Sequence, residues 1–417
     1  MKVYKFGGAS IKSQETVKNM ADILKKFPEK KLVIVVSAMG KTTNNLENLF
    51  KLAINNQNYD KKLQEIEEYH NKMYGNLLSS DKNRTMVEQV FQNLKSSLSN
   101  VNQSNHQDML YDELVSYGEL LSSTIIYGYL SELGFPVVWI DARNFIKTDN
   151  THREGKINWA LTCNLIKNHL MPLLSNHILI TQGFIGSTEA DTTITLGREG
   201  SDFTAAIIAF CLNAESVTIW KDVQGILNAD PKRFPNTKLF HQLSYQEAAE
   251  MTYYGASVIH PKTIKPLANK NIPLNVKSFE SPDLPGTVID IGGPHKLHPT
   301  FVIKDEQCLV SFFARDLAFI NEKNLSIIFH VLDMLNIKIN MMQNSAVSLT
   351  ICVDNHAGKV QQMIDTLKND FTIKFNENLR LITIKNYTPK SIKEVTKGNT
   401  ILVEQRTRNT FQIVVDI

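Results

Sequence analysis

Within residues 1–291, short β-rich runs alternate with longer segments whose apolar residues recur with helical period. The predicted strands are Lys2–Phe6, Leu32–Ser37, Val137–Asp141, His177–Gly183, Ser216–Lys221 and Leu274–Ser278. Helices are predicted between most of them, as at Ile11–Phe27, Glu113–Leu130, Trp159–Leu174 and Asp202–Leu212. Alternation of this kind favours an α/β fold in which a mostly parallel sheet is sandwiched by helices.

One long segment interrupts this alternation. Residues 44–100 are charged and helical in pattern and contain no predicted strand. The segment could extend over the mouth of a site in the sheet, or it could form packing helices with one face in solvent. The sequence leaves both interpretations open.

The C-terminal part has a different organisation. Residues 280–299 concentrate proline and glycine, which indicates a linker. A βαββαβ order follows, typical of a ferredoxin-like unit, with elements at Cys308–Phe313, Glu322–Leu335, Lys338–Gln343, Ala346–Val353, His356–Asn369 and Phe371–Phe375. A further β, α, β, β string resembles a second copy that stops before its last helix and strand. We therefore expect domains at residues 1–291, 301–376 and 377–417.

Composition excludes several classes of protein. A chain of 417 residues with a net charge of only +3 is long enough for two or three domains and gives no support for bulk attraction to nucleic acid or membranes. No targeting segment or membrane span is apparent, so a soluble, cytoplasmic protein is expected. The cysteines lie far apart in apolar runs, which predicts buried free thiols in a reducing compartment; they are Cys163, Cys211, Cys308 and Cys352.

Two strand–glycine–helix turns carry the most informative chemistry. Lys5, Gly7 and Gly8 close the first predicted strand, and residues 196–202 (LGREGSD) lead directly into an apolar helix. Backbone N–H groups at a helix start favour an anion. Two such turns, each with a cation, predict that one polyanion is held from two sides, as in a kinase. A lone Gly-Gly pair is more often an ordinary turn.

Other candidate residues lie near strand ends or in apolar surroundings. Ser37 and Thr43 follow the second strand and could line a crevice or cap a helix. Glu119 lies in an apolar helical run, either on an exposed stripe or turned inward to bind an ammonium group. Arg198 offers a planar fork for a carboxylate or phosphate. Asp202 could orient Lys5 or a metal, or cap its helix.

The loop after the strand Ser216–Lys221 could border a nucleotide or be a plain surface turn. A lone His260 is more often structural than catalytic. No Ser–His–Asp order, paired-cysteine metal site or GxxxxGK[ST] loop is present. Any metal is therefore expected to be Mg²⁺ carried by phosphates and held by oxygens.

Six motifs together give a specific resemblance. In order they are KFGG, VSAMGKTTN, YGELLS, GREGSDFTAA, WKDVQGILNADP and GASVIHPKTIKP. They resemble the aspartokinases of the amino-acid kinase superfamily, whose C-terminal units are ACT domains. The resemblance implies that ATP phosphorylates the side-chain carboxylate of L-aspartate to 4-phospho-L-aspartate, the first step toward lysine, threonine and methionine, in a monofunctional enzyme.

The resemblance also implies roles for matching residues. Glu119 would bind the substrate ammonium group, Arg198 its α-carboxylate, and Asp202 would organise Lys5 and the phosphoryl centre. Ser37, Thr43, Phe184 and Ser201 would line the substrate pocket. The residues expected to contact ATP, with Mg²⁺ carried by the nucleotide, are Lys5, Gly7, Gly8, Ser10, Lys221, Asp222, Leu227, Asp230, Lys232, Ser257 and Val258. No general base is needed, because the attacking carboxylate is already ionised.

Some positions depart from the family pattern. Ala9 replaces a usual Thr, Glu199 a frequent Gly, Leu227 a frequent aromatic residue and Ser257 a frequent Lys, so altered nucleotide affinity is expected. Glu199 should be tolerated only if its side chain points away from the anions.

The expected effector is lysine or threonine, with Asn321, Leu325 and Ser345 as candidate contacts, although Ala346 stands where lysine-inhibited relatives have Glu. A homodimer through the ACT units is implied. The alternatives are a superfamily kinase acting on glutamate, carbamate or a nucleotide, and a catalytically silent amino-acid sensor.

Overall fold

The computed structural model describes residues 1–101, 106–256, 259–293, 298–315 and 319–416. The chain forms two compact units. The first comprises Met1–Ile226, Leu239–Ala249 and Val258–Pro294, and the second comprises Leu227–Lys238, Glu250–Ser257 and His295–Ile417. Two short segments of the expected domain 1–291 thus group with the C-terminal unit. The three-domain division remains a prediction.

An eight-stranded sheet forms the centre of the first unit. Its strand order is β3-β4-β2-β1-β7-β9-β10-β8, and its pairs are parallel except for β9 with β10. The bounds are β1 Lys2–Phe6, β2 Leu32–Val36, β3 Val137–Ile140, β4 Ile178–Gln182, β7 Ser216–Lys221, β8 Gln242–Ser244, β9 Leu274–Ser278 and β10 Thr287–Asp290. All six predicted strands are present, and β8 and β10 are additional. A two-stranded ribbon, β5 (Ile185–Ser187) with β6 (Thr193–Thr195), lies outside this sheet.

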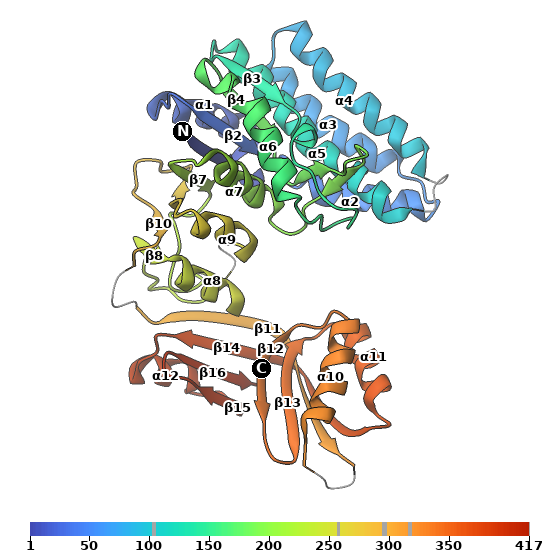
Figure 1. Ribbon diagram of the computed structural model, residues 1–417, viewed down its shortest axis with the longest axis vertical. Coiled ribbons are helices and arrows are strands. Elements are labelled where there is room, and N and C mark those ends of the chain that lie inside the picture. The colour runs from blue at the N-terminus through green and yellow to red at the C-terminus, as the bar shows by residue number, and fades with distance from the viewer. Residues whose placement is uncertain (102–105, 257–258, 294–297, 316–318, 417) are drawn as a thin grey trace. The chain divides into compact units, whose positions relative to one another are not determined.

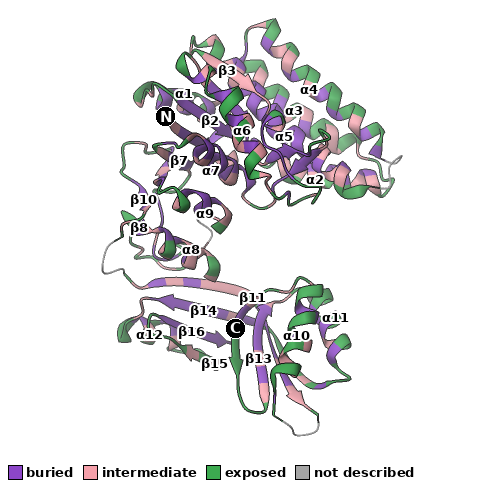
Figure 2. Cartoon of the chain, viewed as in Figure 1, coloured by how far each residue is buried: buried purple, intermediate pink, exposed green. Residues whose placement is uncertain are grey.

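Helices cover the sheet, which explains the unbroken apolar sequence of its inner strands. All five residues of β2 are buried, and a strand buried along its whole length must be covered on both faces (Figure 2). Helix α7 (Gly200–Leu212) contacts β1, β2 and β7, and α5 (Gln107–Glu132) contacts β2, β3 and β4. The expected α/β fold with a mostly parallel, helix-covered sheet is confirmed.

The interrupting segment forms three helices, α2 (Thr42–Ile54), α3 (Asp60–Leu77) and α4 (Asp81–Ser99). All three pack against α5, and Figure 1 shows α3, α4 and α5 running alongside one another. The other helices of the first unit are α1 Gln14–Lys26, α6 Trp159–Leu170 and α9 Pro261–Asn269, with short 3-10 turns such as Gly8–Ile11. Helix α8, Tyr245–Tyr254, has its first residues in the first unit and its last in the second. No described helix has the length and hydropathy that a bilayer crossing requires.

The second unit contains one six-stranded antiparallel sheet, in the order β12-β13-β11-β14-β16-β15. Its elements are β11 Thr300–Ala314, α10 Glu322–Met334, β12 Ile339–Asn344, β13 Ser348–Asp354, α11 Ala357–Leu367, β14 Phe371–Lys385, α12 Pro389–Thr396, β15 Ile401–Arg406 and β16 Thr410–Val415. The first six elements follow the expected βαββαβ order.

The two predicted C-terminal units share long strands. The start of β11 pairs with the end of β14, the end of β11 pairs with the start of β14, and the register shifts between residues 304 and 309. The expected boundary at 376/377 therefore lies inside β14, and β11 lends its first residues to the part of the sheet that also holds β15 and β16. This shared strand adds one strand to the shortened second copy.

The expectation that all four cysteines are free is wrong. Cys163 on α6 and Cys211 on α7 form a disulfide, because these two helices pack together and bring residues 48 apart in sequence side by side. Cys308 and Cys352 are free and buried, and burial raises the pKa of each thiol to about 12.

Candidate active site

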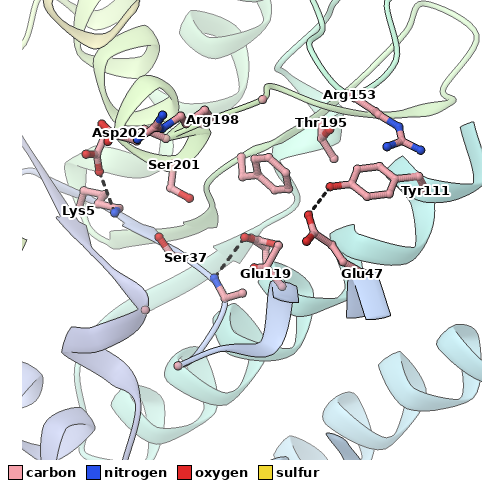
Figure 3. Close-up of a pocket in the computed structure, with 18 of the residues that line it drawn as sticks. Lys5, Ser37, Glu47, Tyr111, Glu119, Arg153, Thr195, Arg198, Ser201 and Asp202 are labelled. Carbon is pink, nitrogen blue, oxygen red and sulfur yellow. Dashed lines mark hydrogen bonds and ion pairs between the residues drawn. The ribbon is translucent and has the colours of Figure 1, made fainter. Parts of the chain in front are cut away.

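The predicted site residues of the first unit gather around a cavity of about 550 Å³ at the carboxyl ends of β1, β2, β4 and β7 (Figure 3). Neighbouring parallel strands end at the same edge of a sheet, so residues distant in sequence meet there. The volume lies within the range of small-ligand pockets. Helix α2 contributes Thr43 and Glu47, so the interrupting segment both packs on α5 and reaches the cavity.

A buried charge cluster lies at one side of the cavity. The Asp202 Oδ1 atom is 2.7 Å from Lys5 Nζ, and its Oδ2 atom is 3.7 Å from Lys221 Nζ. Burial alone would raise the pKa of Asp202, but the Lys5 and Lys221 ammonium groups outweigh it and hold the pKa below its usual range. Asp202 is therefore an ionised carboxylate that holds two ammonium groups beside the cavity.

The start of α7 forms another wall. A Cβ added to Gly183 would lie 2.4 Å from Ser201 Cβ, so glycine is required for this close approach. Phe184 and Glu199, both lining the cavity, have φ values of 68° and 55°, an uncommon left-handed conformation for non-glycine residues. Such strained residues concentrate at functional sites.

Arg198 lies in this turn, just before α7 begins. Its side chain is exposed and makes no hydrogen bond or ion pair within the part of the chain that the structure describes. A guanidinium group without a protein partner at a helix start is suited to bind a carboxylate or phosphate.

Glu119 is turned inward. Its side chain lies on α5, lines the cavity and belongs to a residue that is only 3% exposed. The Oε1 atom accepts a hydrogen bond from Ala38 N at 3.3 Å, and the Oε2 atom has no partner among the described residues. Burial raises the pKa of Glu119 to about 8. An ammonium ligand would complete this carboxylate, and of the two interpretations left open the inward one is correct.

The glycine turn after β1 brings two backbone segments together. A Cβ on Gly8 would lie 2.6 Å from the Ala38 carbonyl oxygen, which leaves room only for glycine. Gly8 lines the cavity, whereas the buried Ser10 donates its hydroxyl to the Trp220 carbonyl oxygen at 2.9 Å. Ser10 thus ties the turn to β7.

The structure brings most of the predicted residues of the first unit together. Those lining the cavity are Lys5, Gly8, Ser37, Thr43, Glu119, Phe184, Arg198, Ser201, Asp202 and Lys221. Gly7, Ser10 and Asp222 are not among its lining residues, and Leu227, Asp230 and Lys232 belong to the second unit. Ser257 and Val258 lie outside the described residues. The role of each residue remains a prediction.

Sequence reasoning missed a polar end of the cavity formed by Glu47, Tyr111, Arg153 and Thr195. The Tyr111 hydroxyl donates to Glu47 Oε1 at 2.6 Å, and the Arg153 guanidinium lies 4.0 Å from the Tyr111 ring centroid. Figure 3 shows these residues across the cavity from Lys5 and Asp202. They come from two helices, a loop and the end of β6, none of which carries a recognisable motif. Glu199, which should be tolerated only if its side chain points away from the anions, is among the lining residues, and its buried Oε2 atom has no partner among the described residues.

The effector candidates lie in the second unit, where local structure already uses two of them. The Asn321 side chain caps α10 in a reciprocal pair with Asn324, and the Ser345 hydroxyl bonds to Ser348. Leu325, on α10, is partly buried and packs against the hydrophobic core of this unit. These contacts leave the effector assignment a prediction.

The described residues contain no group of three or more His, Cys, Asp or Glu side chains placed to hold a metal ion. His260 caps α9, accepting a hydrogen bond from Lys262 N at 3.2 Å.

A model of the amino acid kinase family matches residues 1–278. Lysine-sensitive aspartokinase 3 of Escherichia coli (strain K12) is 31% identical over 353 residues, covering 84% of this chain and 78% of that protein. A bifunctional chloroplastic aspartokinase/homoserine dehydrogenase 1 of Zea mays is 33% identical over 303 residues, covering 69% of this chain. The chain spans only 32% of the length of that relative.

Solved structures of E. coli aspartokinase III are similar over 100% of this chain and 96% of theirs. The complex with aspartate and ADP, in the R-state, has a TM-score of 0.85 at 26% identity. The complex with lysine and aspartate, in the T-state, has a TM-score of 0.82 at 27% identity.

Proposed function

The chain belongs to the amino acid kinase family and, within it, to the aspartokinases, and we propose that it transfers the γ-phosphoryl group of ATP to the side-chain carboxylate of L-aspartate. The product is 4-phospho-L-aspartate. The observation that carries this proposal is the joint presence in one cavity of Glu119, Arg198 and the Lys5–Asp202–Lys221 cluster.

The charges of the cavity match those of aspartate. The unpartnered Oε2 atom of Glu119 would accept from the α-ammonium group, and the Arg198 guanidinium would bind the α-carboxylate. Glu119, Arg198 and Lys5 all line the same cavity. A zwitterion held this way can direct its second carboxylate toward the lysine cluster, where phosphate charge would be neutralised.

Catalysis in this arrangement consists of positioning and charge neutralisation. The attacking carboxylate is already ionised, so no side chain has to remove a proton. Lys5 and Lys221 would stabilise negative charge on the transferring group. Asp202 is buried and ionised, so its ion pairs hold the Lys5 and Lys221 side chains in place before the substrates bind.

The nucleotide would lie along the glycine turn, where the contact between Gly8 and the Ala38 carbonyl keeps side chains out. Both carboxylate oxygens of Asp202 face lysines, so a Mg²⁺ ion would be held mainly by phosphate oxygens. That ion would add further charge neutralisation. The other proposed nucleotide contacts are Gly7, Ser10, Asp222, Leu227, Asp230, Lys232, Ser257 and Val258.

We also propose that the C-terminal unit binds an amino-acid effector, lysine or threonine. The same unit is proposed to form a homodimer. The similarity to an aspartokinase III complex with lysine supports the effector. A cytoplasmic location is also proposed. Disulfides are rare in a reducing cytosol, so a count of free thiols in freshly lysed cells would show whether Cys163 and Cys211 are oxidised there.

Substrate analogues test the proposal directly. ADP release would be measured with L-aspartate, N-acetyl-L-aspartate, 3-aminopropionate and L-glutamate. The first two analogues lack the ammonium group and the α-carboxylate respectively, so each should lose at least about 100-fold in kcat/KM. Equal turnover of L-glutamate would favour another superfamily kinase. Absence of ADP release with every compound, from folded protein that binds ATP, would favour the silent sensor.

A further inference from the structure

Asp112 is a buried carboxylate that the proposed reaction does not use. It lies on α5, is 0% exposed, and accepts hydrogen bonds from three residues. The donors are Thr195 Oγ1 at 2.5 Å, His152 Nδ1 at 2.8 Å and the Arg153 backbone N at 3.0 and 3.1 Å from the two carboxylate oxygens. Burying a carboxylate is costly unless it is paired, so these contacts hold three separate segments together.

One of these segments is the loop at residues 152–155. Arg153 has a φ of 64°, a conformation that bulky residues adopt rarely and only where the surroundings enforce it. One contact that favours it is the hydrogen bond from the Arg153 backbone N–H to Asp112. Asp112 therefore helps to hold this loop in its observed conformation.

The loop in turn supports the segment that carries Arg198. Gly155 N donates to the Thr195 carbonyl oxygen at 2.9 Å, and a Cβ on Gly155 would lie 2.4 Å from Ile194. Gly197, with a φ of 76°, faces the Arg153 carbonyl oxygen, which a Cβ on Gly197 would approach to 3.2 Å. Thr195 ends β6 only three residues before Arg198, and both its hydroxyl and its carbonyl group are thus fixed.

The same helix bears Glu119. Asp112 and Glu119 are seven residues apart on α5, which places them on one helix face roughly 10 Å from each other. One rigid helix thus carries the expected ligand of the α-ammonium group and, through Asp112, the anchor of the turn that presents Arg198.

We propose that Asp112 is a positioning residue that fixes the distance between Glu119 and Arg198, and thereby the fit of the cavity to the α-ammonium and α-carboxylate groups of an amino acid. This inference rests on the proposed function, because it assigns those two groups to Glu119 and Arg198. Thr195 acts in the same way through its hydroxyl group.

The test compares Asp112→Asn and Thr195→Val with wild type in steady-state assays. Both changes remove hydrogen-bonding partners with little change in side-chain volume. The expected result is an increase of about 10- to 100-fold in KM for aspartate, with kcat and KM for ATP within about threefold of wild type. A residue with only a structural role would instead lower the melting temperature and the active fraction, leaving both KM values unchanged.

Asp108→Asn is the matched control. Asp108 lies on the same helix, is 65% exposed in its side chain, and pairs with Arg153 Nε at 2.6 Å. Its loss removes the surface ion pair of Arg153 and leaves the Asp112 contacts intact, so the KM for aspartate should stay near that of wild type. Thermal melting would establish that each variant is folded.

The outcomes separate the two proposals. Turnover of aspartate by wild type together with an unchanged KM in both Asp112→Asn and Thr195→Val would overturn the role of Asp112 alone. Failure of wild type to bind or phosphorylate aspartate would overturn the proposed function, and this inference with it. An equal rise in KM for ATP would also contradict it, because a general loosening of the unit would then explain the defect.

Discussion

The raised pKa of Glu119 predicts that aspartate affinity depends on pH near neutrality. In the free site this carboxylate is buried and has one hydrogen bond, from Ala38 N, and its pKa is about 8. It is therefore mostly protonated at pH 7, and a protonated carboxyl group cannot pair with the substrate ammonium group. Raising the pH through 8 produces the ionised form that binds.

The magnitude follows from the fraction of Glu119 that is ionised. With a pKa of about 8, that fraction is roughly 1% at pH 6, about 9% at pH 7 and about half at pH 8. The kcat/KM for aspartate should therefore rise about ninefold from pH 6 to 7 and about fivefold from pH 7 to 8. Since bound substrate already holds Glu119 ionised, kcat should change little.

The assay is coupled ADP release at saturating ATP between pH 6 and 8, with Glu119→Gln as the comparison. The amide does not titrate in this range, so the variant should bind aspartate weakly and without this pH dependence. Proton release on aspartate binding, measured by calorimetry in buffers of different ionisation enthalpy, should approach one proton at pH 7. A flat kcat/KM profile for wild type, or a midpoint near the ordinary glutamate pKa, would refute the reasoning.

Three further predictions concern the same unit. Lys5→Ala and Asp202→Ala should each lower kcat by about 100-fold or more in folded protein, since each removes part of the buried charge cluster; near-normal turnover in both would disprove these roles. Reduction of the Cys163–Cys211 disulfide, which closes a loop of 48 residues, should lower the free energy of unfolding by up to about 4 kcal/mol, and melting with and without reductant measures this. Glu199→Gly should raise the free energy of unfolding by about 1 kcal/mol, because glycine tolerates the φ of 55° that Glu199 adopts. Denaturant titration of the wild type and the variant measures this, and equal free energies of unfolding would show that the strain is absent.

The inner strands were predictable because parallel strands covered on both faces require continuous apolar runs, as in β2. The strand β8 was missed because it is only three residues long, and β10 because it lies within residues 280–299, whose proline and glycine content indicated a linker. The full lengths of β11 and β14 were not predicted because each strand has a polar stretch in its middle. There the pairing register shifts and buried and exposed residues no longer alternate.

Within the site, the residues that sequence analysis found are those in motifs at strand ends and at the start of a helix, such as Lys5 and Arg198. Tyr111, Arg153 and Asp112 were missed because their positions depend on how α5 packs against a distant loop. The disulfide was missed for the same reason, since only the packing of α6 on α7 brings its cysteines together.

The most direct test of the proposed reaction is chemical trapping of its product. Protein, ATP, Mg²⁺ and L-aspartate would be incubated with hydroxylamine, which converts an acyl phosphate into a stable hydroxamate, and the product would be located by fragmentation in a mass spectrometer. The account predicts aspartyl hydroxamate on the side-chain carboxyl group, formed only with ATP and reduced by lysine or threonine if the effector proposal holds. Hydroxamate on the α-carboxyl group, or none from folded protein that binds ATP, would contradict the account.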